Sequence, residues 1–343
     1  MQRTRKKTRP GQTDIANALG VSVSTVSRAL ADSPAINDDI KRQVYEVALK
    51  IGYPVKAHTV VERLDQIVVL TSVAGFNDTR SSIYYGLLEG IKTAATRSGT
   101  VVSTSITQSR TPLPADLRNK LGPKTGCVFL GITPSPDVAQ YLHDQRIPAL
   151  VCNGVDEELL IDSISPANYS GGRLMARYLM DKGHRKFLYF GGVHRTTLRR
   201  RASGFRQYVE KESGMDGAEI VATYEQRGPL SDDLLTDFTD WLERNRGDAT
   251  ALFCYNDGAA AWAIEAAKIL GISVPDDLSI AGFDDMPIAD LTTPGLTTYR
   301  IDWQQIGLQC VALLTARMEN PESPTQYLQV GGTFVERASV ITA

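Results

Sequence analysis

The stretch TDIANALGVSVSTVSRAL, residues 13–30, decides the fold of the N-terminal part of the chain. Its second half carries four hydroxyl residues and one arginine on a segment whose apolar residues have the spacing of a short helix. Serine and threonine are mediocre helix formers, so helix propensity does not account for so many of them in one place. Their side chains must instead serve the surface of this helix.

The spacing of the apolar residues predicts two short helices joined by a tight turn. We expect Thr13 to cap the first helix, in which Ile15 and Leu19 share one face at i, i+4. Gly20 supplies the left-handed conformation that ends this helix, and Ser22 caps the second one. The face that the second helix buries is expected to consist of Val26, Ala29 and Leu30.

The residues left on the outer face of the second helix suit a DNA interface. Hydroxyls donate hydrogen bonds to phosphates, an arginine reads base edges, and a small apolar group fits a thymine methyl. This outer set consists of Val23, Ser24, Thr25, Ser27 and Arg28, next to the cap residue Ser22. The pattern predicts a helix-turn-helix, and the spacing alone leaves a generic helical hairpin with a polar face as the alternative.

A third helix and the distribution of charge support the DNA-binding interpretation. Asn37 can cap this helix and Gly52 can end it. Its apolar stripe consists of Ile40, Val44, Val47 and Ile51. Residues 1–60 hold ten Lys/Arg and five Asp/Glu, whereas the remaining residues hold twenty-seven and thirty-four. A basic head on an acidic body indicates a nucleic-acid-binding module joined to a second domain.

Composition argues against several other classes of protein. The opening run MQRTRKKTRP has too little apolar character for a signal peptide, and no apolar run is long enough to span a bilayer. The histidines lack metal-ligand spacing, and the cysteines are far apart, mostly in apolar runs. These cysteines are Cys127, Cys152, Cys254 and Cys310. We therefore expect a cytoplasmic, nucleoid-associated protein with buried free thiols and no metal, cofactor or membrane partner.

From residue 66 onward, short apolar runs alternate with amphipathic helical patterns. The strand-like runs are QIVVLTSV, TVVSTSI, GCVFLGI, PALVCN, KFLYFGG, EIVATY, ALFCYN and LSIAGFDD. Such alternation predicts an α/β fold of parallel sheets with helices on both faces. About ten strands are too many for one compact sheet of this length, so we expect two doubly wound subdomains. Ligands of such folds bind at the carboxyl ends of the strands, here in a cleft between the subdomains.

The motifs along the chain resemble those of the lac-repressor (LacI/GalR) family. In the head these are TDIANALGVSVSTVSRAL and INDDIKRQVYEVALKIGY; in the body they include RRRASGF, CYNDGAAAWAI, GISVPDDLSIAGFDD and PGLTTYR. The resemblance implies a helix-turn-helix head at 1–53, a hinge at 54–65, and a periplasmic-binding-protein-like effector and dimerisation domain at 66–343. It assigns base reading to Val23, Ser24 and Arg28, and phosphate contacts to Ser22, Thr25 and Ser27.

The resemblance also implies which residues of the body bind the effector. Asp284, at the end of the run SIAGF, is implied to accept hydrogen bonds from two hydroxyls, and Arg199 matches the family's effector-binding arginine. Ser170 and Tyr84 match further effector contacts, although Tyr84 suits the apolar core equally well. Asn256 is assigned to the effector in preference to a helix cap.

The neighbours of these residues are assigned structural roles. Asp257 is expected to cap the helix that follows Asn256, and the resemblance assigns Asp285 to the structure. Adjacent residues at a strand end point to opposite faces, so Asp284 and Asp285 do not make an acid/base couple. Arg201 is expected to brace the cleft, and Arg200 suits a solvated face. Together with Arg195, the arginines near residue 200 favour an effector with an acidic end.

Two departures from the family pattern concern the hinge and the body. The family's hinge helix ends in Ala-Arg-Ser-Leu, and its leucine enters the minor groove. Here the segment PVKAHTVVERLDQ is shorter and has Glu62 at the leucine position, with Val60 and Val61 as the nearest apolar residues. Ala167 stands where the family usually has an aspartate.

The sequence thus predicts a homodimeric transcriptional regulator, in particular a repressor, that binds double-stranded operator DNA. A small polar effector (a sugar, sugar acid or sugar phosphate) is expected to control its operator affinity. An α/β enzyme acting on a sugar or nucleotide is the first alternative, but the chain has no dinucleotide-binding glycine motif, phosphate-binding loop or nucleophile elbow. An exported sugar-binding protein is the second, and the missing signal peptide argues against it.

Overall fold

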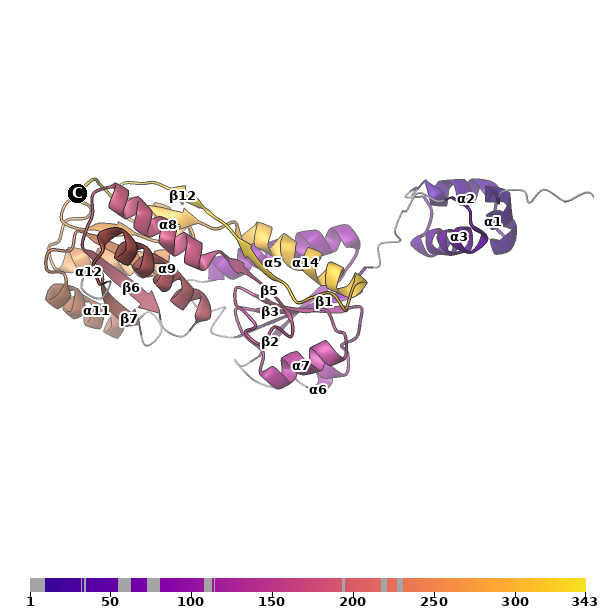
Figure 1. Cartoon of the computed structure of the whole chain (residues 1–343), viewed down its shortest axis with the longest axis horizontal. Coiled ribbons are helices and arrows are strands. Elements are labelled where there is room, and N and C mark those ends of the chain that lie inside the picture. The colour runs from indigo at the N-terminus through magenta and orange to yellow at the C-terminus, as the bar shows by residue number, and fades with distance from the viewer. Residues whose placement is uncertain are drawn as a thin grey trace, which may run out of the picture. The chain divides into compact units, whose positions relative to one another are not determined.

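The computed structural model describes residues 10–31, 33, 35–54, 63–72, 81–107, 113, 115–192, 195–216, 221–226 and 231–343. The chain divides into two compact units, a head at residues 1–63 and a body at residues 64–343 (Figure 1). This division falls within the segment predicted to be the hinge. Val60, Val61 and Glu62 of that hinge lie outside the described residues, as do residues 1–9 at the start of the basic head.

The head consists of the three predicted helices around one small core. They are α1 (Gln12–Leu19), α2 (Val23–Leu30) and α3 (Asp38–Ile51). The buried residues of this core are Ile15, Ala16, Val26, Ala29, Val44 and Ala48. Leu30 and the rest of the predicted α3 stripe pack against them as partly buried side chains. The apolar spacing therefore placed the buried faces of these helices correctly.

The caps of the head helices follow the sequence except at the first one. Gly20 and Gly52 end α1 and α3 with φ of 65° and 74°, as predicted. At the start of α1 the prediction of Thr13 is wrong, because the helix begins two residues earlier than predicted and Gly11 occupies the cap position. The Asp14 carboxylate accepts a hydrogen bond of 2.8 Å from the Gly11 N–H. The reciprocal bond of a capping box cannot form, because glycine has no side chain to accept a bond from the Asp14 N–H.

The N-terminal subdomain of the body is a six-stranded sheet in the order β11-β5-β4-β3-β1-β2, with every pairing parallel. The strands are β1 (Gln66–Thr71), β2 (Val101–Ile106), β3 (Thr125–Leu130), β4 (Ala149–Cys152), β5 (Asp162–Pro166) and β11 (Tyr327–Val330). Helices α5 (Ser81–Ser98) and α14 (Trp303–Glu319) cover one face, and α6 (Ala115–Arg118) and α7 (Pro136–Asp144) the other (Figure 1). Residues of β1 alternate between the two apolar layers, as a strand buried on both faces must.

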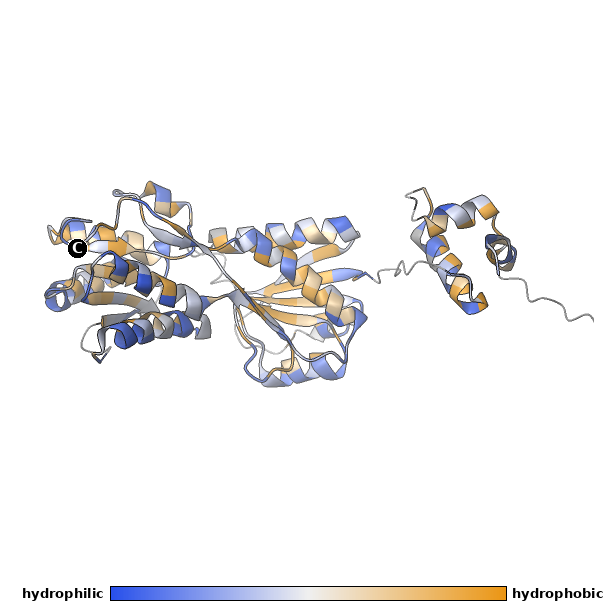
Figure 2. Ribbon diagram, turned by 45° about the horizontal axis from the view of Figure 1, so that its top comes forward, coloured by the Kyte–Doolittle hydropathy of each residue, from blue (hydrophilic) through white to orange (hydrophobic). Residues whose placement is uncertain are grey.

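The C-terminal subdomain repeats this plan with a four-stranded parallel sheet in the order β7-β6-β8-β9. Its strands are β6 (Phe187–Gly192), β7 (Val221–Gln226), β8 (Ala251–Cys254) and β9 (Ser279–Ala281). Its helices are α8 (Asn168–Asp181), α9 (Thr196–Ser213), α11 (Asp232–Asn245), α12 (Asp257–Ile269) and the short α13 (Ile288–Leu291). Figure 2 shows apolar strands enclosed by helices with polar outer faces, which is the predicted doubly wound arrangement.

The chain passes between the two subdomains three times. The passages run from β5 to α8, from β10 (Thr298–Arg300) to α14, and from β11 to β12 (Thr333–Val335). β10 and β12 pair antiparallel beside the C-terminal sheet. Isolated bridges join Thr297, just before β10, to Ala281 and Arg300 of β10 to Asp284. The strand-like runs of the sequence did not include β5, β10, β11 or β12, because these segments are short and rich in polar residues. Each subdomain therefore contains strands from distant parts of the chain.

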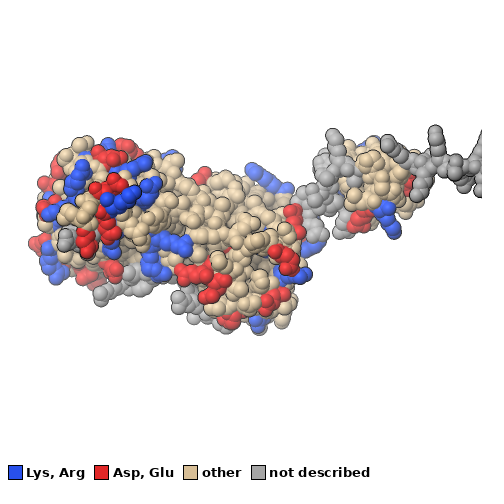
Figure 3. All heavy atoms as spheres, viewed as in Figure 1, with Lys and Arg blue, Asp and Glu red and all other residues tan. Residues whose placement is uncertain are grey.

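The four cysteines are buried and free, as predicted. In the described part of the chain, no helix combines the length and apolar character needed to cross a bilayer, and no three potential metal-ligating side chains gather. Figure 3 shows acidic and basic side chains interspersed over the visible face of the body.

Each subdomain contains a helix pair that meets at two glycines. Gly90 of α5 faces Gly307 of α14, and a Cβ on either residue would lie 2.9 Å from the Cα of the other. In the same way Gly172 of α8 lies against the backbone of α9, and Gly204 of α9 lies against the backbone of α8. The missing side chains let these backbones approach more closely than any other residue type would allow.

We expect Gly307→Ala to lower the free energy of unfolding by about 1–3 kcal/mol, because the new methyl group would press on Gly90 and on the backbone of α5. This loss should appear although alanine favours a helix over glycine by about 1 kcal/mol. Urea unfolding midpoints measure the difference. Gly122→Ala is the matched control, since a Cβ there meets no described atom within 4 Å. Equal midpoints for both variants would show that the helices separate freely.

Candidate DNA-binding surface and effector site

The outer face of α2 presents the residues predicted to contact DNA. Val23 is 43% exposed, and Ser24, Ser27 and Arg28 are also exposed, while Thr25 is half-buried. These side chains therefore lie on the surface opposite the packed face of α2, where a DNA groove could reach them.

The start of α2 carries an ordered cluster of hydroxyls. The Ser22 hydroxyl accepts a hydrogen bond of 3.0 Å from the Thr25 N–H, which confirms it as the cap. The same oxygen lies 2.8 Å from the hydroxyls of both Ser24 and Thr25. Three hydroxyls at the positive end of a helix form a suitable surface for a phosphate.

Tyr45 of α3 holds the recognition surface in place and was not singled out from the sequence. Its hydroxyl donates a hydrogen bond of 3.1 Å to the carbonyl of Leu30, at the end of α2, while its ring is buried. This bond fixes the orientation of α2 on α3. The apolar stripe of α3 omitted Tyr45, because its position lies one residue beyond Val44 at the edge of the stripe.

In the body, Arg201 is the charged residue at the centre of the candidate effector site. Its side chain is 4% exposed, and its Nη2 donates a hydrogen bond of 2.6 Å to the amide oxygen of Asn168. Its Nη1 donates to the carbonyl of Tyr255, and its guanidinium carbon lies 3.4 Å from the centroid of the Phe283 ring. Arg201 thus connects α9 to the first residue of α8 and to the ends of β8 and β9, more centrally than the predicted bracing role required.

Asp284 lies beside Arg201 with one oxygen unused. Asp284 is 4% exposed, and its Oδ1 lies 3.9 Å from Arg201 Nη2, which is too far for a hydrogen bond. Among the described residues, this oxygen has no hydrogen-bond partner. Burial raises the pKa of Asp284 to about 7, while the charges of Arg201 and Arg195 act in the opposite direction. Asp284 therefore has a buried acceptor oxygen without a partner beside a buried guanidinium.

The positions of Asn256 and Asp257 reverse one structural assignment. Asn256 is the cap of α12, since its side-chain oxygen accepts a hydrogen bond of 2.8 Å from the Ala259 N–H. Asp257 is therefore not the cap, and that prediction is wrong. Its fully buried carboxylate instead accepts hydrogen bonds from the Met286 N–H at 2.6 Å and the Thr298 hydroxyl at 2.5 Å. The cap role of Asn256 leaves its amide nitrogen free to donate to a ligand.

Asp285 has the structural role that was predicted for it. Its carboxylate pairs with Arg300 at 2.6 Å and with Arg337 at 2.9 Å. These bonds join the end of β9 to β10 and to the C-terminal segment.

The structure does not bring Arg199 to Asp284. Arg199 is exposed on α9, and its Nη2 donates a hydrogen bond of 2.8 Å to the Thr196 hydroxyl. Two residues along a helix correspond to a rotation of about 200°, so Arg199 and Arg201 lie on opposite sides of α9. Arg201, for which a bracing role was predicted, is thus the arginine that lies beside Asp284. Ser170 is also exposed, on α8.

Arg195 and Thr196, at the start of α9, connect the two subdomains. Arg195 Nη2 donates a hydrogen bond of 2.6 Å to the carbonyl of Asn153, which follows β4. The Thr196 hydroxyl donates a bond of 3.2 Å to the carboxylate of Glu157. Arg200 lies with its guanidinium carbon 5.1 Å from the ring centroid of Tyr327, so it also faces the N-terminal subdomain. We call this region the interdomain junction. It comprises these contacts and the three chain passages between the subdomains.

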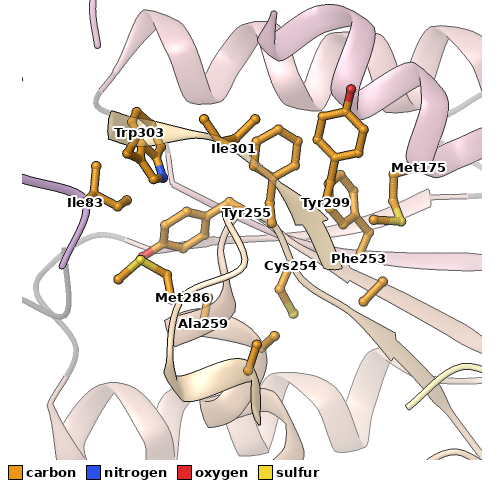
Figure 4. Packing of buried hydrophobic residues seen from close by; sticks show 14 of the residues in the cluster. Ile83, Met175, Phe253, Cys254, Tyr255, Ala259, Met286, Tyr299, Ile301 and Trp303 are labelled. Atoms are coloured by element: carbon orange, nitrogen blue, oxygen red, sulfur yellow. The ribbon is translucent and has the colours of Figure 1, made fainter. Parts of the chain in front are cut away.

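Apolar side chains from both subdomains complete the interdomain junction. Ile83 of α5 and Trp303 of α14 lie near Tyr255 and Met286, which follow β8 and β9 (Figure 4). Tyr84 was open between an effector contact and a core residue. It is 4% exposed, and its hydroxyl packs against Gly131 at the end of β3. This burial favours the packing role for Tyr84.

Sequence reasoning did not single out Asn168 or Trp303. Asn168 holds Arg201, and Trp303 has a buried indole nitrogen that bonds to none of the described residues. Asn168 gave a signal, since the departure noted at Ala167 directly precedes it. Trp303 gave none, because a tryptophan before an amphipathic helix reads as an ordinary apolar residue.

Known proteins share this architecture and this order of parts. A family model described as bacterial regulatory proteins, lacI family, matches residues 13–54, and one described as a periplasmic binding protein-like domain matches residues 176–340. The HTH-type transcriptional regulator DegA of Bacillus subtilis (strain 168) is 30% identical over 313 residues, covering 86% of this chain and 88% of the relative. The match thus spans the head and the body together.

Solved structures agree with the fold. The transcriptional regulator CelR in complex with cellobiose is 21% identical, with a TM-score of 0.66 over 96% of this chain and all of that one. The lac repressor dimer bound to operator and the anti-inducer ONPF is 22% identical, with a TM-score of 0.65 over 97% of this chain and all of that one. The predicted regulator is thus favoured over the α/β enzyme, and the chain belongs to the LacI family of DNA-binding transcriptional regulators.

Proposed function

We propose that the exposed face of α2 reads operator DNA and that a small hydroxyl-bearing effector binds at the interdomain junction, where it changes operator affinity. The observation that carries the effector site is the unpartnered Oδ1 of Asp284, which lies 3.9 Å from the buried guanidinium of Arg201. The binding set we propose is Asp284, Arg201 and Asn256, with Arg199 and Ser170 at its exposed margin and Tyr84 as packing.

A hydroxyl group suits the space between Asp284 and Arg201 because it both donates and accepts hydrogen bonds. It would donate to Asp284 Oδ1 and accept from Arg201 Nη2, so that both buried groups gain a partner. Buried polar groups without partners are costly, and a ligand that supplies the partners gains that free energy on binding. The complex of CelR with cellobiose supports a polyhydroxylated effector for this fold.

We infer that the protein acts on DNA as a homodimer with a two-fold symmetric operator. The lac repressor relative is a dimer on its operator, and a helix-turn-helix pair reads two half-sites in successive major grooves. Binding to the operator would place the protein at the nucleoid. The direct test is a gel shift on DNA fragments upstream of the gene, with and without candidate sugars. Failure to shift any of these fragments more strongly than unrelated DNA would contradict operator binding.

We expect Arg28→Ala to relax base preference at one operator position, because Arg28 is exposed on the reading face of α2. The loss on the preferred operator should be about 1–3 kcal/mol, and single-base variants at that position should bind with nearly equal affinity. Competition binding across a set of single-base operator variants measures this. An equal loss on every variant would instead identify Arg28 as a phosphate contact.

Asp284→Asn and Arg201→Lys should each remove the response to effector while operator binding survives, because these residues lie in the body and the reading face lies in the head. Arg201→Lys keeps the charge but loses the forked donors that hold Asn168 and Tyr255. Operator titrations with and without the effector found by gel shift provide the measurement. A variant that responds at the wild-type effector concentration would remove that residue from the proposed site.

The stability of the wild type and of Asp284→Asn should diverge with pH. The pKa of Asp284 is about 7 in the folded protein, above its ordinary value of 3.8. The stability that the bound proton provides is complete below about pH 4 and is lost as the pH rises to about 7. The wild type should therefore lose free energy of unfolding relative to Asp284→Asn over this range, by about 1.4 kcal/mol per unit of pKa difference. Urea titrations at several pH values measure this difference, and a constant difference would contradict the assignment.

A further inference from the structure

The charges at the interdomain junction do not balance. Arg201 bonds to neutral oxygens of Asn168 and Tyr255, and its nearest carboxylate is Asp284 at 3.9 Å. Arg195 has no carboxylate partner among the described residues, and its bond goes to the carbonyl of Asn153. Two guanidinium groups therefore face one carboxylate, whose burial favours its neutral form.

The nearby Asp257 does not restore the balance. It is fully buried, and both of its carboxylate oxygens are already bonded, to Met286 and Thr298. Burial raises its pKa well above the ordinary value, and the neighbouring Asp284 adds to that effect. Arg195 is half-buried, and a positive charge there without a carboxylate partner favours an anionic ligand, since a guanidinium binds a carboxylate or phosphate through two parallel hydrogen bonds.

A second unpartnered polar atom lies at the same junction. The indole nitrogen of Trp303 is buried and has no hydrogen-bond partner among the described residues. Trp303 begins α14, directly after the passage that leaves β10, and the N–H of Ile301 in that passage donates to the Asp284 carbonyl at 3.3 Å. Asp284 and Trp303 are thus fixed to the same short segment, one offering an acceptor and the other a donor.

The apolar neighbours of Trp303 suit a ring. Ile83 approaches from the N-terminal subdomain, and Tyr255 and Met286 from the C-terminal one (Figure 4). The Tyr255 hydroxyl is bonded to Gln226 at 2.6 Å, and its ring is buried. A ring-shaped ligand at this junction would meet apolar side chains, while its hydroxyls meet the polar atoms at the edge.

We propose that the effector is a cyclic, hydroxyl-bearing acid whose oxyanion, a carboxylate or a phosphate, binds Arg195. One of its hydroxyls lies between Asp284 and Arg201, and another oxygen accepts from the indole of Trp303. The inference rests on the proposed function, because it assigns a chemical class to the ligand of that same site. Binding at Arg195 also gives the acid access to both subdomains, since Arg195 bonds to Asn153 across the junction.

The test uses thermal unfolding of the full-length protein with four probes at equal ionic strength, adjusted with sodium chloride. The probes are inorganic phosphate, D-glucose, D-glucuronate and D-glucose 6-phosphate. We expect inorganic phosphate and at least one sugar acid to raise Tm by about 2–4 °C and D-glucose to have little effect. Glucuronate and glucose 6-phosphate distinguish a carboxylate from a phosphate.

Arg195→Gln and Arg206→Gln form a matched pair of variants on α9. Both remove one positive charge, but Arg206 is exposed, three turns further along α9, and bonds to Thr223. The stabilisation by phosphate and by the sugar acid should disappear in Arg195→Gln and persist in Arg206→Gln. If Arg195→Gln retains it, the anion binds elsewhere, for example at the DNA-binding head, and the proposal is overturned.

Trp303→Phe tests the donor directly, because phenylalanine keeps an aromatic ring and lacks the N–H. We expect the dissociation constant of the stabilising sugar acid, measured by calorimetry, to rise about 5-fold, and unchanged affinity would remove Trp303 from the site.

Two outcomes separate this inference from the proposed function. Equal or greater stabilisation by D-glucose overturns the acid and leaves the hydroxyl-binding site in place. If neither phosphate nor either acid raises Tm above the sodium chloride reference, the acid is likewise overturned. The proposed function is then judged separately, by whether Asp284→Asn removes the operator response to effector.

Discussion

A guanidinium that is removed from water must be hydrogen-bonded on several sides, and Arg201 satisfies this requirement by joining three parts of the body. It reaches Asn168 at the start of α8, Tyr255 at the end of β8 and the ring of Phe283 at the end of β9. Moving any of these segments away from Arg201 would remove a partner from a buried charge, which costs free energy. The same residue stands beside Asp284, so the structural anchor and the proposed effector site are one set of atoms.

Local patterns were sufficient to predict the head and most of the sheet strands. Serine is preferred at the start of a helix and glycine at its end, as at Ser22, Gly20 and Gly52. The apolar residues of α2 and of α3 recur at a spacing that defines one buried face on each helix. Strand β5, DSISP, was not predicted, because it alternates polar residues in a position buried on both faces. Its burial depends on β4 and β11, which are distant in sequence, so no local pattern contains that information.

Neighbouring residues of the same type limit what the sequence predicts about the candidate site. RRRASGF contains three consecutive arginines, and a shift of two positions moves the side chain to the other side of α9. The sequence assigned a bracing role to Arg201, but its position beside Asp284 depends on tertiary packing. At Asn256 and Asp257 both residues cap helices well, and the choice depends on which of them keeps an extended backbone before α12. Tertiary contacts of Asp257 with Met286 and Thr298 settle that choice.

The arrangement of rigid and adjustable regions explains how a ligand at the junction can reach the rest of the molecule. Within each subdomain, the paired glycines hold two helices in backbone contact, which leaves little freedom for change inside the layers. Between the subdomains there are three chain passages and a few polar contacts such as Arg195 to Asn153. A ligand that binds at this junction meets both subdomains, and it can favour one arrangement over another only by its differential contacts with them. In the proposed site, the unpartnered atoms of Asp284 and Trp303 would supply such contacts, because both are buried and neither has a hydrogen-bond partner among the described residues. A ligand that satisfies both atoms would favour the arrangement of the subdomains in which it reaches both.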